Sequence, residues 1–287
     1  MAKLLEKITE RMFSVSAMIS ALVAVLIFGF LLIFGLPLLR GGHIFGLLTH
    51  PWVPRQGLYG ISPMLLGTLS ISTLSMAFAL PLSFGCASLV SVFAPRRFGG
   101  FLRRVMQVMT GIPTVIYGFV GIFLLVPLIR EIFQSGSGMC VLSASLMLAV
   151  LISPTMVLFF VDGFDRVPRS SLDAVAALGG NKAQTFLYVI LPNAWKSVLS
   201  GIVLAYGRAL GDTLIALMIA GNAVQVPGSL LESARTLTAH IALVIAADYD
   251  SLEFKSIFAC GLILYLCSTF IVVFIRAIGA LYGGKEQ

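Results

Sequence analysis

Charged side chains are scarce in this sequence. Asp, Glu, Lys and Arg make up only 11% of the 287 residues, whereas a soluble domain carries about 25%. Hydrophobic residues make up 59%, and the mean hydropathy is +1.02. Water is therefore excluded as the solvent for most of the chain, and the composition indicates an integral membrane protein.

Residues that carry metal or nucleophilic chemistry are also few. The four cysteines and three histidines show neither paired metal-ligand spacing nor the H-E-x-x-H pattern, and no G-x-S-x-G elbow occurs. Gly279, Gly284 and Lys285 have the spacing of a phosphate-binding loop, but Glu286 stands where that motif requires Ser or Thr. We therefore expect no enzyme activity, no metal site, no cofactor and no ATP binding by the chain itself.

Long uncharged runs account for most of the chain. A transmembrane helix needs about 20 apolar residues to cross the hydrocarbon core, and six runs reach that length. The sequence therefore predicts an all-α polytopic membrane protein with six transmembrane helices in one domain, residues 13–287. The expected spans cover residues 13–39, 63–94, 105–129, 139–161, 197–221 and 256–280.

Residues 1–12 precede the first expected span and mix apolar with charged side chains. Leu4 and Ile8 share one helical face, and Lys3 and Lys7 lie on the other. This pattern favours a separate helix at the membrane interface. A frayed basic tail is the alternative.

The distribution of Lys and Arg predicts the orientation. With the N-terminus in the cytoplasm, 13 of the 19 basic residues fall on the cytoplasmic side, five fall on the opposite side, and Arg208 lies within a span. Cytoplasmic loops of membrane proteins are enriched in these residues. We therefore expect both termini in the cytoplasm and attribute the net charge of +7 to topology, not to nucleic-acid binding.

The segment between the fourth and fifth expected spans is too patterned for a simple turn. Asp173 and Ala174 favour a short helix, and Gly179 and Gly180 interrupt it. A second short helix follows and is expected to end at Pro192. Two short helices around a glycine turn are thus predicted at the cytoplasmic face.

An ionisable residue, Arg208, lies near the centre of the fifth expected span. A charge there costs about 2.5 to 3.5 kcal/mol on insertion scales, so it is a functional candidate. Asp212 stands one turn further on, where we expect an ion pair with Arg208. The functional hypothesis is a polar passage in which the guanidinium meets an oxyanion. The alternative is a buried pair that locks two helices, and Gly207 with Gly211 also indicates close helix packing.

The cytoplasmic segment, about 165–195, resembles the EAA loop of ABC importer permeases. That pattern reads E-A-A-x-x-x-G, nine residues, then I-x-L-P, and Asp173 and Val189 here replace Glu and Ile. In the family this loop docks on the cytoplasmic ATPase. The resemblance implies that role for Asp173, Ala174, Gly179, Gly180, Val189, Leu191 and Pro192.

Residues 207–213, followed by 220–222, resemble PstC-type permeases of the bacterial phosphate importer, and residues 111–118 agree with that subfamily. The similarity runs from about residue 60 to the last helix. It implies the type I ABC importer permease fold and translocation of inorganic phosphate. The substrate pathway is then expected to include Arg208, Asp212, Thr213 and Asn222.

The resemblance also implies partners and a location. We expect a heterodimeric pore with a PstA-type permease, a PstB-type ATPase dimer that binds the ATP, and a PstS-type periplasmic binding protein. The expected location is the bacterial inner membrane. A permease for molybdate, sulfate or a phosphonate, and a subunit that senses phosphate supply, are the alternatives.

Overall fold

The computed structural model describes residues 2–39, 46–47 and 49–283. Its regular structure is helical apart from one antiparallel ribbon, in which Trp52 pairs with Tyr59. The α-helices and strands are α1 (Ala2–Leu39), β1 (Trp52–Val53), β2 (Leu58–Tyr59), α3 (Ser62–Ser88), α4 (Arg96–Thr110), α5 (Thr114–Val120), α6 (Val126–Phe133), α7 (Val141–Asp165), α8 (Arg169–Ala177), α9 (Lys182–Thr185), α10 (Leu191–Gly211), α11 (Leu214–Ile219), α12 (Leu237–Val244) and α13 (Leu252–Gly283).

Short helical turns of other kinds join several of these elements. A 3-10 turn, η1 (Pro54–Gln56), connects the two strands. Three π-helical turns continue or join helices without a break in the chain path. They are η2 (Leu89–Phe93) after α3, η3 (Gly121–Leu125) between α5 and α6, and η4 (Phe186–Ile190) between α9 and α10.

Helix α7 lies at the centre of the bundle, where it packs against α3 and α10. Ile152, Met156 and Phe160 on this helix are fully buried. Most of α7 is covered by protein, and its sequence is apolar around the helix apart from a few Ser and Thr residues and two aspartates near its C-terminal end. The main hydrophobic core therefore follows the length of α7.

Six helical segments of the described chain are long and apolar enough to cross a membrane. Large apolar side chains such as Phe123, Phe270 and Val273 face outward from them, which suits a hydrocarbon solvent. The prediction of an all-α protein with six membrane helices is confirmed. The segments are 6–36, 62–93, 114–133, 141–165, 182–211 and 252–277.

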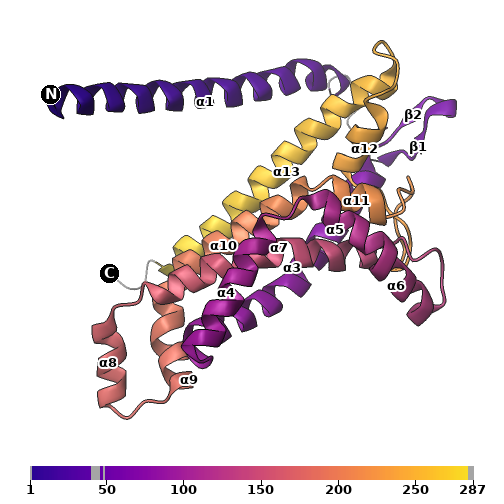
Figure 1. The fold of residues 1–287 in the computed structure, drawn as a ribbon. Coiled ribbons are helices and arrows are strands. Elements are labelled where there is room, and N and C mark those ends of the chain that lie inside the picture. Colours follow the sequence, from indigo (N-terminus) through magenta and orange to yellow (C-terminus); the bar gives the residue numbers. More distant parts are fainter. Residues whose placement is uncertain (1, 40–45, 48, 284–287) are drawn as a thin grey trace.

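The N-terminal helix is continuous from Ala2 to Leu39, so the described part of the predicted interfacial helix, residues 2–12, is not separate from the first membrane helix. Glycine and proline are the residues that most often interrupt a helix, and neither occurs among the first 28 residues. Helix α1 diverges from the bundle and meets it through α13 (Figure 1). At that contact Gly35 approaches the chain closely, since a Cβ there would lie 3.0 Å from the carbonyl oxygen of Phe258.

The third expected span, 105–129, is wrong because the chain breaks within it. Helix α4 ends at Thr110, and α5 begins at Thr114 after Gly111 and Pro113. Proline lacks an N–H and opposes a helical conformation in the residue before it. The Tyr117 hydroxyl bridges the break by donating to the Met109 carbonyl at 3.0 Å. The third candidate membrane helix is therefore 114–133.

The fifth expected span, 197–221, also differs from the structure. The helix starts at Lys182, runs through η4 and α10, and ends at Gly211. Pro192 stands in the first turn of α10 and does not end a helix. Pro192 has no N–H to donate within the helix, and the Asn193 side chain beside it donates through Nδ2 to the Val189 carbonyl at 2.7 Å.

The end of the bundle opposite α8 and α9 carries α12 and the β-ribbon (Figure 1). His240 on α12 is fully buried and meets Trp52 edge to face, with ring centroids 4.3 Å apart. The Thr68 hydroxyl accepts a hydrogen bond from the Leu237 N–H at 2.8 Å and so joins α3 to the start of α12.

Candidate functional site

A pocket of about 390 Å³ opens where three helix ends meet. Helix α10 ends at Gly211, α11 starts at Leu214, and α5 starts at Thr114. Both interruptions of the expected spans therefore lie at this pocket. Its lining consists of Thr114, Arg208, Gly211, Asp212, Thr213 and Leu214.

Arg208 lies in the last turn of α10 and is half-buried. Its Nη1 is 3.5 Å from the Thr155 hydroxyl on α7, a long contact. In the part of the chain that the structure describes, Arg208 forms no ion pair; the ion pairs there belong to Arg103. The guanidinium therefore lines the pocket without an ion-pair partner among the described residues.

The predicted ion pair between Arg208 and Asp212 is therefore wrong. The prediction assumed one continuous helix, in which the two side chains would lie one turn apart. Instead α10 ends at Gly211, and Asp212 is extended with φ −69° and ψ 131°. The extended backbone turns the carboxylate away from the i, i+4 position.

Asp212 instead holds the start of α11. Its Oδ2 accepts a hydrogen bond from the Ile215 N–H at 2.9 Å, as an N-terminal capping residue does. Its backbone carbonyl accepts a hydrogen bond from the Thr238 hydroxyl at 2.7 Å. Asp212 therefore fixes α11 against α12 while it lines the pocket.

The other two predicted pathway residues lie in different places. Thr213 lines the pocket, but Asn222 does not. Asn222 has a positive φ of 58°, and its Nδ2 donates to the Leu217 carbonyl at 2.6 Å. Its own carbonyl accepts from Arg235 Nε at 3.0 Å. The structure thus joins Arg208, Asp212 and Thr213 and gives Asn222 a role in the loop after α11.

Gly207 and Gly211 do not pack against another helix within the described chain. A Cβ built on either residue would meet no atom within 4 Å. Gly211 lies in the pocket wall instead. Close packing at these positions would require a second chain.

The segment from α8 to α9 projects from one end of the bundle (Figure 1). Asp173 and Ala174 are exposed on α8, and Gly179 turns the chain with φ 77°. Gly180 is closely packed against Val175, since a Cβ at this position would clash with the Val175 side chain. The remaining predicted coupling residues lie in η4 and the first turn of α10, where Val189 and Leu191 are half-buried and Pro192 is exposed.

The tip of this segment carries apolar side chains into solvent. Leu178 in the turn is 88% exposed, and Tyr188, beyond α9 in η4, is 77% exposed. Asn181 and Gln184 form a capping box that starts the second helix. An ordered turn with exposed apolar residues is suited to contact with another protein.

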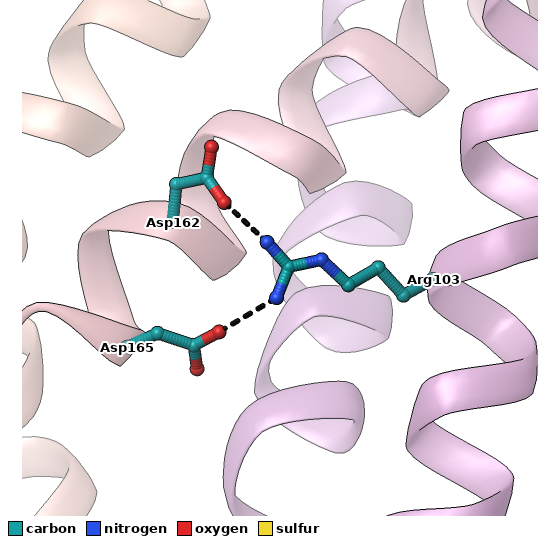
Figure 2. A network of polar contacts seen from close by, with 3 residues as sticks. All are labelled: Arg103, Asp162 and Asp165. Atoms are coloured by element: carbon teal, nitrogen blue, oxygen red, sulfur yellow. Dashed lines mark hydrogen bonds and ion pairs between the residues drawn. The ribbon is translucent and has the colours of Figure 1, made fainter.

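Sequence reasoning missed a bridge between α4 and α7. Arg103 donates to Asp162 at 2.6 Å and to Asp165 at 2.9 Å (Figure 2). The two acidic residues stand three apart at the end of α7 and therefore share one face. That spacing was a visible signal, although nothing in the sequence identified the partner helix.

Sequence reasoning also missed Thr114 as a pocket residue. The available signal was the Gly111–Pro113 break inside an apolar run, because a break in a membrane helix requires a compensating environment. Across the described ranges, no group of three or more His, Cys, Asp or Glu side chains could hold a metal ion.

The fold and the pocket together define a polytopic membrane protein of the transporter class. Residues 79–280 match the family described as binding-protein-dependent transport system inner membrane component. The chain therefore belongs to this family of ABC importer permeases. It is a multi-pass inner-membrane transporter subunit, and family membership implies ATPase and binding-protein partners.

Individual relatives agree with this assignment. The chain is 33% identical to the probable ABC transporter permease protein YqgH of Bacillus subtilis, over 76% of this chain and 71% of that protein. It is 31% identical to the phosphate transport system permease protein PstC of Pasteurella multocida, over 79% of this chain and 77% of that protein.

A solved structure shares the fold. The match is a bacterial ABC transporter involved in the import of the acidic polysaccharide alginate, with a TM-score of 0.60. The comparison covers 88% of this chain and 94% of that chain at 13% identity. This likeness shows the type I ABC importer permease fold alone.

Proposed function

We propose that this chain is the permease subunit of an ATP-driven importer of inorganic phosphate. Two observations support the proposal. A relative that is 31% identical over 79% of this chain bears the name of a phosphate transport permease. The Arg208 guanidinium opens into a pocket without an ion-pair partner among the described residues.

The assignment of an oxyanion substrate depends on one observation, which is that Arg208 lines the pocket without an ion-pair partner among the described residues. A guanidinium offers several N–H donors in a planar fork, which matches the oxygens of a tetrahedral oxyanion. A half-buried position strengthens the attraction relative to bulk water. In this proposal Thr213 lies beside the anion, and Asp212 keeps the pocket wall in place.

The segment from α8 to α9 is proposed as the coupling element for a PstB-type ATPase dimer, which binds the ATP. Asp173, Ala174 and the turn at Gly179 present the contact, and η4 connects that turn to α10. Any movement of the turn therefore reaches Arg208 through one helical path. The chain itself needs no cofactor in this scheme.

Two further partners complete the proposed complex in the bacterial inner membrane. A PstA-type permease would cover the open side of the pocket and contact Gly207 and Gly211. A PstS-type binding protein would deliver phosphate from the periplasm. The excess of Lys and Arg on one side supports a cytoplasmic location for both termini.

Uptake of radiolabelled phosphate into vesicles that contain the four-component complex tests the proposal. ATP-dependent uptake that requires the binding protein is expected, together with loss of uptake in Arg208→Gln and intact assembly of that variant. Import of molybdate or sulfate instead of phosphate would retain the permease and overturn the substrate. Normal uptake by Arg208→Gln would remove Arg208 from the pathway.

A further inference from the structure

The break between α4 and α5 places one hydroxyl at the pocket that contains Arg208. Thr114 is the first residue of α5 and follows Pro113 directly. The Tyr117 hydroxyl donates to the Met109 carbonyl across the break, and Tyr117 is only 7% exposed. Thr114 therefore stands at a fixed position in the fold.

The Thr114 hydroxyl is available for a ligand. Within the described ranges it has no hydrogen-bond partner, whereas Thr110, four residues earlier, donates to the Gln107 carbonyl at 2.7 Å. Thr114 lines the pocket together with Arg208. A half-buried hydroxyl without a partner is suited to bind a polar group that enters the pocket.

The environment of Arg208 leaves a role for such a hydroxyl. The guanidinium shares the pocket wall with Gly211, Asp212, Thr213 and Leu214, and its contact with the Thr155 hydroxyl is 3.5 Å long. A tetrahedral oxyanion has oxygens in four directions, so one planar guanidinium leaves some of them without a donor. Each oxygen left without a donor after desolvation costs free energy.

We propose that Thr114 is a substrate-binding residue of this transporter, whose hydroxyl donates to an oxygen of the oxyanion that Arg208 attracts. The proposal rests on the function proposed above and adds the third membrane helix to the substrate pathway. Binding then joins α5 to α10 through the ligand. A serine at this position satisfies the requirement, whereas a valine of similar shape leaves the oxygen without its donor.

The test compares Thr114→Val, Thr114→Ser and the control Thr110→Val in the reconstituted four-component complex. The measurement is ATP-dependent uptake of radiolabelled phosphate at saturating binding protein, with co-purification of the subunits as the check on assembly. Thr114→Val is expected to lower the turnover of uptake about tenfold, the effect of losing about 1.4 kcal/mol. Thr114→Ser and Thr110→Val are expected to keep the wild-type turnover.

A second measurement covers the case in which Thr114→Val does not assemble. In a complex containing Thr114→Cys, inorganic phosphate is expected to slow modification of the thiol by a charged reagent, with the wild-type complex as the background. Unchanged labelling with phosphate would overturn the inference.

The outcomes separate the two proposals. If the wild-type complex imports no phosphate, the proposed function fails. If the wild type imports phosphate and Thr114→Val matches it, only the role of Thr114 fails. Equal losses in Thr114→Val and Thr110→Val would indicate a general disturbance of the break and would also overturn the role.

Discussion

At the scale of single residues, Asp212 has a role that its distance from Arg208 in the sequence conceals. Its carboxylate caps the start of α11 through the Ile215 N–H. Asp212→Ala is expected to lower the free energy of unfolding by about 1 kcal/mol, whereas Asp212→Asn keeps the cap and the stability. Thermal unfolding of the detergent-solubilised protein measures both. Equal destabilisation by Ala and Asn would show that the charge, not the cap, matters.

His240 gives the molecule a pH dependence. Burial, and secondarily the positive charge of Arg235, lower the pKa of this imidazole to about 4. The folded state then binds fewer protons than the unfolded state, whose histidine has a pKa of about 6.5. The contribution of His240 to stability is therefore fully present above about pH 6.5 and is lost as the pH falls toward about 4.

The variant His240→Phe removes this titration and keeps an aromatic ring beside Trp52. Between pH 7 and pH 5 the wild type is expected to lose about 2 kcal/mol more stability than the variant. Denaturant unfolding at the two pH values is the measurement. Parallel losses in the two proteins would contradict the lowered pKa.

At the scale of elements, the turn between α8 and α9 depends on Gly179. Its φ of 77° suits glycine, and a Cβ would meet no atom within 4 Å. Gly179→Val is therefore expected to strain the turn by about 1 to 2 kcal/mol through conformation alone, whereas Gly179→Asn is tolerated because Asn adopts positive φ. The number of ATP molecules hydrolysed per phosphate imported should rise in the Gly179→Val variant and stay unchanged in the Gly179→Asn variant. A normal ratio in Val would count against coupling through this turn.

The ion pairs that join α4 to α7 give a second prediction at the scale of elements, which concerns stability. The Arg103, Asp162 and Asp165 side chains in Figure 2 are 38%, 51% and 45% exposed, so solvent weakens each pair. Arg103→Gln is expected to cost at most about 1 kcal/mol. The double variant Asp162→Asn with Asp165→Asn should cost the same, and combining all three changes should add nothing further. Additive losses in thermal unfolding would show independent roles.

At the scale of the whole molecule, the orientation is testable with reporters. A phosphatase that is active only in the periplasm is expected to be inactive when fused after Gln287 and active when inserted near Ser229, between α11 and α12. The reason is the excess of basic residues on the proposed cytoplasmic side. A reversed pattern would invert the topology and move the α8–α9 segment away from any cytoplasmic ATPase.

Much of the architecture could be predicted from the sequence because apolar length alone identifies membrane helices. The all-α class and the turn at Gly179 follow from local rules. The breaks at Gly111–Pro113 and after Gly211 were missed because hydropathy is insensitive to backbone conformation. For the same reason Asp212 was predicted to pair with Arg208, although its carboxylate accepts a hydrogen bond from the Ile215 N–H at the start of α11.

The partners of distant residues were beyond sequence reasoning. Arg103 could have faced lipid headgroups, and only the packing of α4 on α7 brings it to Asp162 and Asp165. Thr114 enters the pocket because three helix ends converge there. Such long-range placements come from the tertiary fold.

The π-helical turn η4 has a consequence for the phase between the two ends of one long helix. An i→i+5 turn holds one residue more than the α-helical path needs, so it acts as a built-in insertion between Thr185 and Leu191. Deleting a single residue there would convert the turn to α-helix and leave the α8–α9 segment close to its present phase relative to Arg208. Deleting a residue within α10 instead would rotate that segment by about 100° about the helix axis and shorten the path by about 1.5 Å. The direction in which the turn at Gly179 faces is thus expected to tolerate loss of one residue in η4 and not loss of one residue in α10.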